Sequence, residues 1–474
     1  MFKRLSIAVF KFFLAGHGMS GQTRRYFLLA ALVGVLVGFV TVAFNWMIRF
    51  AQVYVMEGLG RHRSFSTLPS GEILRSFWSW DAVADWHRIL LVFLPATGAV
   101  LGYLLIRRFA RVEHARGTDS AVRAFHRGES IPRTVIPVKS VASVLTVGFG
   151  GSAGYEGPVT LLGAACGSVV NRWFHLNARE SRILMGAGLS AGIAALFRAP
   201  FAGAIFGAEI FYSSSDLEAD MILPSCVSSV LSYTIFAGFY GWDPLFQMPP
   251  HAFENGLRLI PYFALALIVT FGARFYIGLF RRVELWFARR PWPPWTRVGL
   301  GGLLVGALGF AFPDVLGSSY SVIQASFTAG ESDVFAQHGT LTVLGFLSFF
   351  FIKAFATSLT VGSGGSGGVF APALVCGGSL GAATGLFFKQ VLPASVGIHP
   401  AAFALVGMAA FLASSIRVPL TAVVMVAEIS GNHALLLPTM WACGIAFWLN
   451  NGWSLYRSQV HCRESSPLYT PARA

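Results

Sequence analysis

Residues 138–158 read VKSVASVLTVGFGGSAGYEGP, and residues 352–372 read IKAFATSLTVGSGGSGGVFAP. The two segments align without a gap at a constant offset of 214 residues, which places Lys139 opposite Lys353. Both contain Leu-Thr-Val-Gly, then Gly-Gly-Ser, and both end on a proline. A shared excess of small residues would not place a lysine and a proline in the same order. These segments therefore indicate a duplicated chain.

A second set of matches lies further along the chain, at an offset of 219 residues. Arg-Ala-Pro at 198–200 pairs with Arg-Val-Pro at 417–419, and Ala-Glu-Ile at 208–210 recurs at 427–429. In membrane transporters, duplicated halves commonly meet near the middle of the bilayer, and the ligand binds where they meet. The repeat therefore directs the search for a site to its most unusual matching segments.

The composition is that of a membrane protein. The chain has 474 residues, of which 55% are hydrophobic and 12% charged, and its mean hydropathy is +0.63. A soluble chain carries roughly 25% charged residues. Residues 27–47 read FLLAALVGVLVGFVTVAFNWM, which reaches the ~20 apolar residues needed to cross a bilayer, and similar runs follow it. We therefore predict an all-α polytopic membrane protein rather than a cleaved signal peptide.

The formal net charge is +14, and the basic residues form short clusters between apolar runs. This is the pattern of cytoplasmic loops, and it argues against nucleic-acid binding. The stretch at about 57–85, which carries carboxylates and turn residues, is the expected outer loop. The clusters are Arg24-Arg25, Arg107-Arg108 with Arg111, Arg281-Arg282 and Arg289-Arg290.

The predicted organisation is one transmembrane domain at residues 25–457. Its first half lies at about 90–240 and its second half at about 300–457. An N-terminal segment, residues 1–24, and a short tail, residues 458–474, are expected in the cytoplasm.

Cysteine and histidine residues show no catalytic or metal-binding pattern. The cysteines have no CxxC spacing and most lie in apolar runs, so neither a disulfide framework nor a metal site is expected. His114 and His126 lie in a polar segment and are expected to be solvated. No HExxH or GxSxG spacing occurs, so neither an enzyme nor a cofactor is expected. The cysteines are Cys166, Cys226, Cys376, Cys443 and Cys462.

Two glycine-rich breaks, Gly148–Pro158 and Gly362–Pro372, interrupt the repeated apolar runs. Each run restarts at a proline, which is favoured at the first position of a helix. A helix that begins inside a membrane leaves N–H groups that face protein or a water-filled cavity, and its positive dipole end attracts anions. Two converging starts would hold a monoatomic anion. The alternative is that the glycines only allow helices to pack closely.

Glu156 lies inside the first break, between Gly154-Tyr155 and Gly157-Pro158. An ionisable residue at membrane depth costs at least about 2.5 kcal/mol, so it indicates function. A carboxylate beside an anion site can block the site when ionised and leave it when protonated. The alternative is a buried glutamate that caps the helix following it.

These motifs resemble those of the ClC family of chloride channels and proton/chloride antiporters. The resemblance rests on GGSAGYEGP, GGSGGVFAP, the K-x-x-A-x-x-L-T-V-G lead-ins and Ser454-Leu455-Tyr456, and covers about residues 25–457. Within the family, the bacterial ClcB-type voltage-gated channels are most similar. The resemblance implies two inverted-repeat halves of tilted and broken helices, a homodimer with one pore per subunit, and a bacterial inner membrane with both termini cytoplasmic. It also implies chloride as the transported ion, and no CBS domains are expected.

The resemblance also implies roles for particular residues. Glu156 falls on the family's gating glutamate, and Val369 and Phe370 fall where backbone N–H groups hold the central chloride. Tyr456 falls on a tyrosine whose hydroxyl donates to the same ion, and Thr118 takes the place of a serine with that role. The expected anion-binding residues are Thr118, Gly154, Glu156, Gly157, Val369, Phe370 and Tyr456.

The central-ion segment departs from the family pattern. Tyr155 stands where the family has arginine, and Asp119 stands where it has glycine. Asp119 would repel chloride if it faced the pore. The favoured alternative is that Asp119 caps the helix that begins at Ser120.

The position that carries protons in the family's antiporters departs from the family pattern as well. Family antiporters usually carry an inner glutamate at the position of Ile210, and isoleucine cannot relay a proton. Glu209 has a counterpart in Glu428, which favours a structural role in both halves. A passive chloride channel is therefore preferred to a proton-coupled antiporter, and a fluoride exporter is the third alternative.

Overall fold

The structure is a computed structural model. It describes residues 19–59, 89–110, 117–249, 253, 256–329, 333–393 and 396–469. The predictions for most of the N-terminal segment, most of the outer loop, Arg111 and His114 lie outside these residues.

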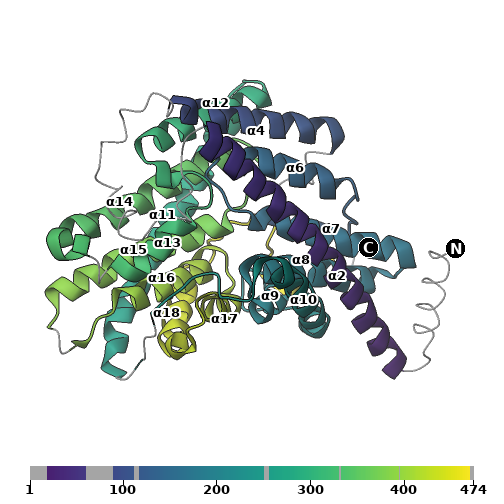
Figure 1. Ribbon diagram of the computed structural model, residues 1–474. Helices are drawn as coiled ribbons and strands as arrows, with labels where there is room; N and C mark the ends of the chain where they lie inside the picture. Colours follow the sequence, from purple (N-terminus) through teal and green to yellow (C-terminus); the bar gives the residue numbers. More distant parts are fainter. Residues whose placement is uncertain are drawn as a thin grey trace.

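The described part of the chain is almost entirely helical, which confirms the all-α prediction (Figure 1). The first helices are α2 (Met19–Ala51), α4 (Ile89–Phe109), α5 (Thr118–Arg127), α6 (Val135–Gly148), α7 (Glu156–Phe174), α8 (Ala178–Phe197), α9 (Pro200–Glu209) and α10 (Ala219–Tyr240). A π-helix, η1 (Gln52–Leu59), extends α2. The later helices are α11 (Leu259–Ala288), α12 (Pro294–Ala311), α13 (Tyr320–Thr328), α14 (Asp333–Gly362), α15 (Phe370–Val391), α16 (Pro400–Ser415), α17 (Pro419–Ser430) and α18 (Leu436–Leu449).

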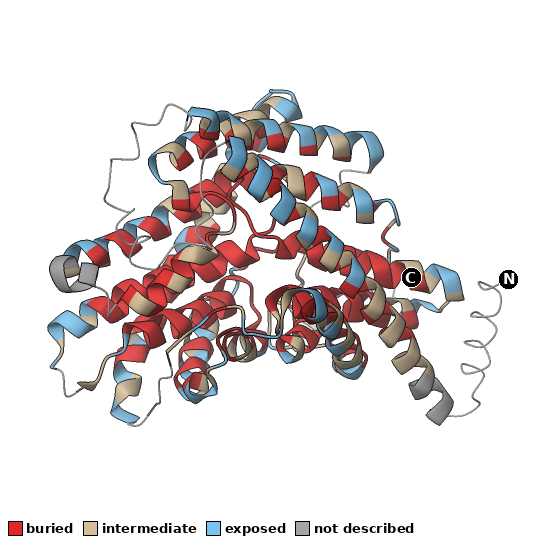
Figure 2. Cartoon of the chain, in the orientation of Figure 1, coloured by how far each residue is buried: buried red, intermediate tan, exposed pale blue. Residues whose placement is uncertain are grey.

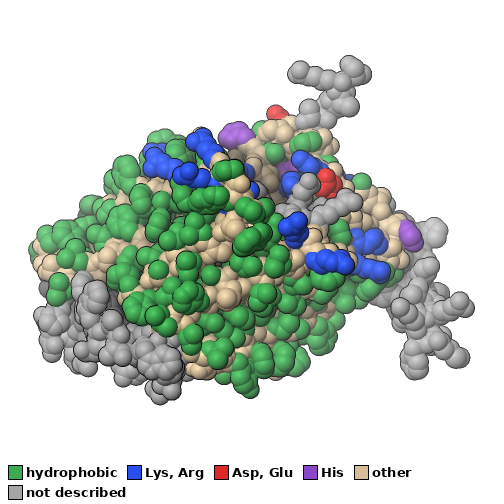
Figure 3. Space-filling model, turned by 90° about the horizontal axis from the view of Figure 1, so that it is seen from above, with side chains coloured by type: hydrophobic (Ala, Val, Ile, Leu, Met, Phe, Trp, Pro, Cys, Tyr) green, Lys and Arg blue, Asp and Glu red, His purple; other side chains and the backbone are tan. Residues whose placement is uncertain are grey.

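Six of the described helical segments are long and apolar enough to cross a membrane. Apolar side chains cover most of the face seen in Figure 3, while lysine and arginine side chains gather in clusters on it. In contrast, α15 is enclosed by the protein, because 94% of an apolar 18-residue stretch of this helix is buried. Figure 2 shows that the buried residues concentrate in the middle, where α7 and α15 approach each other. The broken helices therefore form the core.

The two glycine-rich breaks pair with each other through their backbones. Gly154 and Gly368 exchange two N–H to carbonyl hydrogen bonds, each of 2.8 Å. The pairing requires glycine nearby, because a Cβ on Gly157 would lie 2.7 Å from the Gly368 Cα. This antiparallel contact brings the starts of α7 and α15 together. The predicted close packing of glycines and the predicted meeting of helix starts are thus the same feature.

Threonine and serine residues beside the paired glycines make a second pair of reciprocal hydrogen bonds between the two halves. The Ser152 N–H donates to the Thr360 hydroxyl at 3.1 Å, and the Ser366 N–H donates to the Thr146 hydroxyl at 3.3 Å. These two contacts are related by the 214-residue offset, so each half supplies both partners once. The duplicated segments therefore satisfy each other's free backbone groups around an approximate two-fold axis.

Glu209 connects the two halves near the other end of the repeat. Its carboxylate accepts hydrogen bonds from the N–H groups of Leu420 at 2.9 Å and Thr421 at 2.8 Å, at the start of α17. The Thr421 hydroxyl donates to it as well, at 2.6 Å. Glu209 is thus a buried cap on a helix of the other half.

Glu428 makes the reciprocal contact. It accepts from the N–H groups of Phe201 at 3.1 Å and Ala202 at 2.8 Å, at the start of α9. A carboxylate near a helix start satisfies N–H groups that lack intrahelical acceptors and matches the positive end of the dipole. The reciprocity agrees with the structural role predicted for Glu209.

Replacing Glu209 by alanine should lower the apparent melting temperature of the detergent-solubilised protein. The variant leaves the buried N–H of Thr421 without its acceptor, and such a group costs about 1–3 kcal/mol. Glu129→Ala is the matched control, because Glu129 is exposed and pairs with Arg127 at 3.7 Å, an interaction worth about 0–1 kcal/mol. Equal melting temperatures for the two variants would contradict the capping role.

Candidate anion-binding site

Three helix starts converge on the paired glycine breaks. Gly117, which precedes α5, lies against Gly157 in the first turn of α7, since a Cβ on Gly117 would lie 3.2 Å from the Gly157 Cα. Gly157 in turn lies against Gly368, just before α15. The first N–H groups of a helix have no intrahelical acceptor, and its N-terminus carries a partial positive charge. The point of convergence therefore favours an anion.

Glu156 is fully buried and places its carboxylate at this point. One carboxylate oxygen accepts a hydrogen bond from the N–H of Ala371, the second residue of α15, at 3.3 Å. The other accepts from the hydroxyl of Tyr320, the first residue of α13. These hydrogen bonds reach other helices, so the carboxylate does more than cap its own helix. It occupies the position at the N-terminus of α15 that an anion would take.

Val369 and Phe370 form the start of α15 and are both buried. The Phe370 ring packs against Phe197 and Phe206, with ring centroids 5.3 and 5.6 Å away. This packing fixes the backbone, whose N–H groups at the helix start have no intrahelical acceptor. The geometry suits the predicted backbone contacts to an anion, which stay a prediction.

Tyr456 brings a hydroxyl to the site from the C-terminal segment. Among the described residues, this buried hydroxyl has no hydrogen-bond partner of good geometry, and Thr118 is a neighbour of it. A buried hydroxyl without a partner costs free energy that an anion would offset. Tyr456 is therefore well suited to donate to an anion.

Thr118 is committed to another partner. Its hydroxyl lies 2.7 Å from that of Thr160, and Thr160 donates its only hydroxyl proton to the Gly157 carbonyl at 2.8 Å. Thr118 must then donate to Thr160, and it can donate to an anion only by leaving that partner. Gly154 is engaged as well, because its N–H donates to Gly368. Of these predicted ligands, Tyr456 has the available proton.

Asp119 does not cap its own helix, so the favoured prediction is wrong. The helix begins at Thr118, with Gly117 at the N-cap position and Asp119 in the first turn. The Asp119 carboxylate instead accepts hydrogen bonds from the N–H of Ser458 at 2.9 Å and from its hydroxyl at 3.0 Å. Because Ser458 follows Tyr456 by two residues, Asp119 ties the tyrosine segment to the start of α5.

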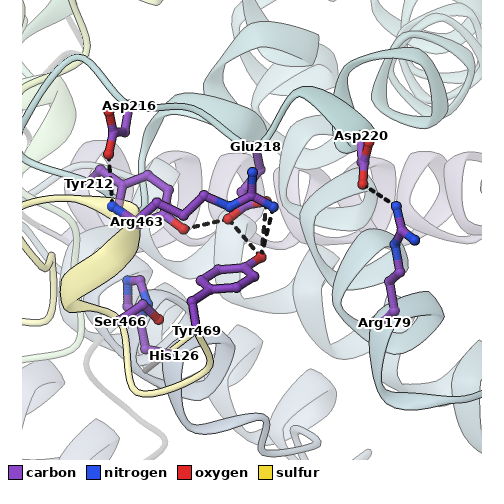
Figure 4. A network of polar contacts seen from close by, with 9 residues as sticks. All are labelled: His126, Arg179, Tyr212, Asp216, Glu218, Asp220, Arg463, Ser466 and Tyr469. Atoms are coloured by element: carbon purple, nitrogen blue, oxygen red, sulfur yellow. Dashed lines mark hydrogen bonds and ion pairs between the residues drawn. The ribbon is translucent and has the colours of Figure 1, made fainter. Parts of the chain in front are cut away.

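The C-terminal segment is anchored along its length by further polar contacts (Figure 4). The Arg463 N–H donates to Asp216 at 2.8 Å, and the Tyr469 hydroxyl donates to Glu218 at 3.1 Å. The segment that carries Tyr456 is therefore fixed to the loop between α9 and α10.

His126 takes part in this anchoring, so the expectation of a solvated histidine is wrong. It is buried in the last turn of α5, and one ring nitrogen lies 2.9 Å from the Ser466 hydroxyl (Figure 4). The other ring nitrogen lies 2.9 Å from the Phe211 carbonyl. Burial lowers the pKa of His126 below its usual value. A neutral ring fits both contacts, with a proton on the nitrogen that faces the carbonyl.

Two further departures from the family pattern are packed within the protein. The Tyr155 hydroxyl accepts a hydrogen bond of 2.6 Å from the Gln52 side chain, which ties α7 to η1. Ile210 is fully buried in the main hydrophobic cluster, and its carbonyl accepts from the Gln459 amide at 2.9 Å. The Ile210 side chain has no group that could carry a proton.

Tyr320 was not predicted from the sequence. It lies outside the repeated segments, and only turn-forming serines precede it. No pattern of spacing marks it as a partner of Glu156, from which it is 164 residues distant in the chain.

Duplicated halves that meet at broken helices are typical of membrane transport proteins, and they place this chain in that class. Within that class, the family model described as "Voltage gated chloride channel" matches residues 98–451. The chain belongs to this family, which confirms the resemblance seen in its motifs. Members of the family are transporters or channels rather than enzymes.

Named relatives and solved structures agree with this assignment. A protein of Ralstonia nicotianae named putative chloride channel protein ClcB-like is 31% identical, over 81% of this chain and 90% of its own. The H(+)/Cl(−) exchange transporter ClcA of Yersinia pestis bv. Antiqua (strain Angola) is 29% identical, over 88% of this chain and 82% of its own.

Two solved structures share the fold. A CLC-type fluoride/proton antiporter gives a TM-score of 0.73 at 22% identity, over 94% of this chain and 100% of its own. A slow cyanobacterial Cl−/H+ antiporter gives 0.72 at 22% identity, over 90% of this chain and 94% of its own. The predicted fold of this family is thus confirmed.

Replacing Asp119 by alanine should weaken chloride binding to the solubilised protein by about tenfold. The Tyr456 segment would lose its anchor at the start of α5. A hydrogen bond to a charged group is worth about 1.5–3 kcal/mol, and the lower value corresponds to about tenfold in affinity. Asp216→Ala is the control, since it frees the same segment further from Tyr456. Isothermal titration calorimetry with chloride measures both variants. Unchanged affinity in Asp119→Ala would show that Asp119 does not position the tyrosine.

Proposed function

We propose that this protein conducts chloride across the membrane as a voltage-gated or pH-gated channel and that Glu156 is its gate. The proposal rests on the position of the Glu156 carboxylate, which lies at the N-terminus of α15 and accepts a hydrogen bond from the N–H of Ala371. An anionic side chain at an anion-favouring position competes with any other anion for it.

Opening requires the carboxylate to leave. Protonation removes its charge and its preference for the helix start, and chloride can then take the Ala371 N–H. On the other side of the site, the Tyr456 hydroxyl supplies a donor without a formal charge. Helix dipoles and a hydroxyl bind more weakly than a fixed cation, which lets the ion leave as well as enter. Chloride is the transported ion, and the proposal needs no cofactor.

The alternative is proton-coupled chloride antiport. The relative from Yersinia pestis is named an H(+)/Cl(−) exchange transporter, which favours this alternative for the present chain. Against it stand Ile210, which carries no proton, and Glu209, whose carboxylate is occupied by the start of α17. We therefore prefer passive conduction. The fluoride/proton antiporter shares the fold at 22% identity, and fluoride export is the third candidate.

We propose a location in a bacterial inner membrane with both termini in the cytoplasm, and a homodimer with one pore in each subunit. The basic clusters, such as Arg281-Arg282, support this orientation.

Liposomes reconstituted with the protein should release chloride down its gradient without moving protons against theirs. The reason is the absence of a titratable side chain at position 210. Chloride efflux and internal pH are followed together, with protein-free liposomes as the control. Proton uptake driven by the chloride gradient would establish the antiport alternative.

Replacing Glu156 by glutamine should leave chloride flux at or above that of the unmodified protein and make it independent of pH. Glutamine copies the protonated form of the side chain, so the gate no longer responds to protons. Flux is measured in liposomes over acid to neutral pH, and Asp220→Asn, at an exposed ion pair with Arg179, is the control. Loss of flux in Glu156→Gln would instead show that Glu156 is structural.

A further inference from the structure

Tyr320 contacts the proposed gate directly, although it lies outside the duplicated segments. It begins α13, and its hydroxyl donates a hydrogen bond to Glu156. Its ring packs edge-on against Phe246, with centroids 5.6 Å apart. The ring is thus placed by packing, while the hydroxyl contacts the carboxylate that lies at the N-terminus of α15.

The loop before Tyr320 is held by a buried lysine. Lys353 in α14 donates to the carbonyls of Val315 at 3.1 Å and Gly317 at 2.8 Å, and to the Ser152 hydroxyl at 3.0 Å. Ser152 belongs to the first glycine break, four residues before Glu156. Lys353 therefore fixes the loop that precedes Tyr320 relative to the segment that carries the gate.

The turn that leads into α13 adds a second constraint. Ser319 adopts a left-handed backbone conformation with φ of 60°, and its hydroxyl donates to the Asp314 carbonyl at 2.6 Å. Together with the lysine contacts, this turn orients the first residue of α13. The tyrosine hydroxyl thus reaches Glu156 from a preorganised element rather than from a free chain end.

We propose that Tyr320 is a latch that holds the ionised Glu156 carboxylate in the anion position and so sets how easily chloride displaces it. The inference rests on the proposed gating role of Glu156. A hydrogen bond to an ionised carboxylate is roughly twice as strong as one between neutral groups, so the latch favours the charged, inward carboxylate. Chloride can occupy the Ala371 N–H only after the carboxylate has moved away. Tyr320 is a positioning residue, since it acts on the ion through Glu156.

The latch predicts a particular change in chloride affinity. When only part of a population has a free site, the apparent dissociation constant rises by the reciprocal of that fraction. Weakening the carboxylate's hold on the site should therefore tighten chloride binding. Tyr320→Phe removes the hydroxyl and keeps the ring that packs on Phe246, so it isolates the hydrogen bond from the packing.

The experiment is a double-mutant cycle on the full-length protein in detergent. Chloride binding is measured by isothermal titration calorimetry for the unmodified protein, Tyr320→Phe, Glu156→Ala and the double variant. Tyr212→Phe is the control, because Tyr212 is a buried tyrosine whose hydroxyl donates to Glu218, away from the gate.

We expect Tyr320→Phe to lower the chloride dissociation constant by about tenfold, the change that corresponds to losing about 1.4 kcal/mol of hydrogen bonding to the carboxylate. In the Glu156→Ala background, where no carboxylate remains, the same substitution should leave the constant unchanged. Tyr212→Phe should leave it unchanged in the unmodified background. This set of results supports the latch.

Three other outcomes overturn the latch and separate it from the gate. If Glu156→Ala tightens binding but Tyr320→Phe does not, the gate stands and the latch fails. If Tyr320→Phe has the same effect in both backgrounds, it acts on the site without Glu156. If Glu156→Ala fails to tighten binding and also abolishes flux in liposomes, the gate itself is wrong and the latch falls with it.

Discussion

A helix that begins inside a membrane must find partners for its first N–H groups, because no water is available to accept from them. In this protein the two halves largely solve the problem for each other. Gly154 and Gly368 pair their backbones, and Glu209 and Glu428 cap helices of the opposite half. At the start of α15 the partner is Glu156 instead, a side chain whose charge depends on pH. The same constraint thus builds both the scaffold and the proposed gate.

The duplication is symmetric in its scaffold and asymmetric in its site. The offset that matches the glycine breaks places Glu156 opposite Phe370. Two carboxylates at the paired breaks would repel each other, because like charges at close range disfavour ionisation of both. Phe370 packs into an aromatic cluster, and the Glu156 carboxylate of the first half reaches its helix start instead. The single carboxylate of Glu156 therefore lies at a position that helix starts from both halves create.

Much of the fold and part of the site could be predicted from the sequence, because the repeat compares the chain with itself. It located both helix breaks and pointed to the matched roles of Glu209 and Glu428. The contacts of Tyr320 with Glu156 and of Asp119 with Ser458 join residues 164 and 339 positions apart, and each contact includes a residue outside the repeated segments. A single long-range hydrogen bond leaves no periodic signal in a sequence. Such contacts become visible only when the fold brings the segments together.

The buried lysine stands near the anion site, but its hydrogen bonds go to the protein's own oxygens. An ammonium group has three protons to donate, and Lys353 directs hydrogen bonds to the oxygens of Ser152, Val315 and Gly317. These hydrogen bonds hold the loop before α13 against the first glycine break, while the amine remains close enough to Glu156 to interact with it electrostatically. What remains for a transported anion are helix starts and the hydroxyl of Tyr456, which bind without a full charge. Binding of that strength lets an ion enter a membrane protein and also leave it.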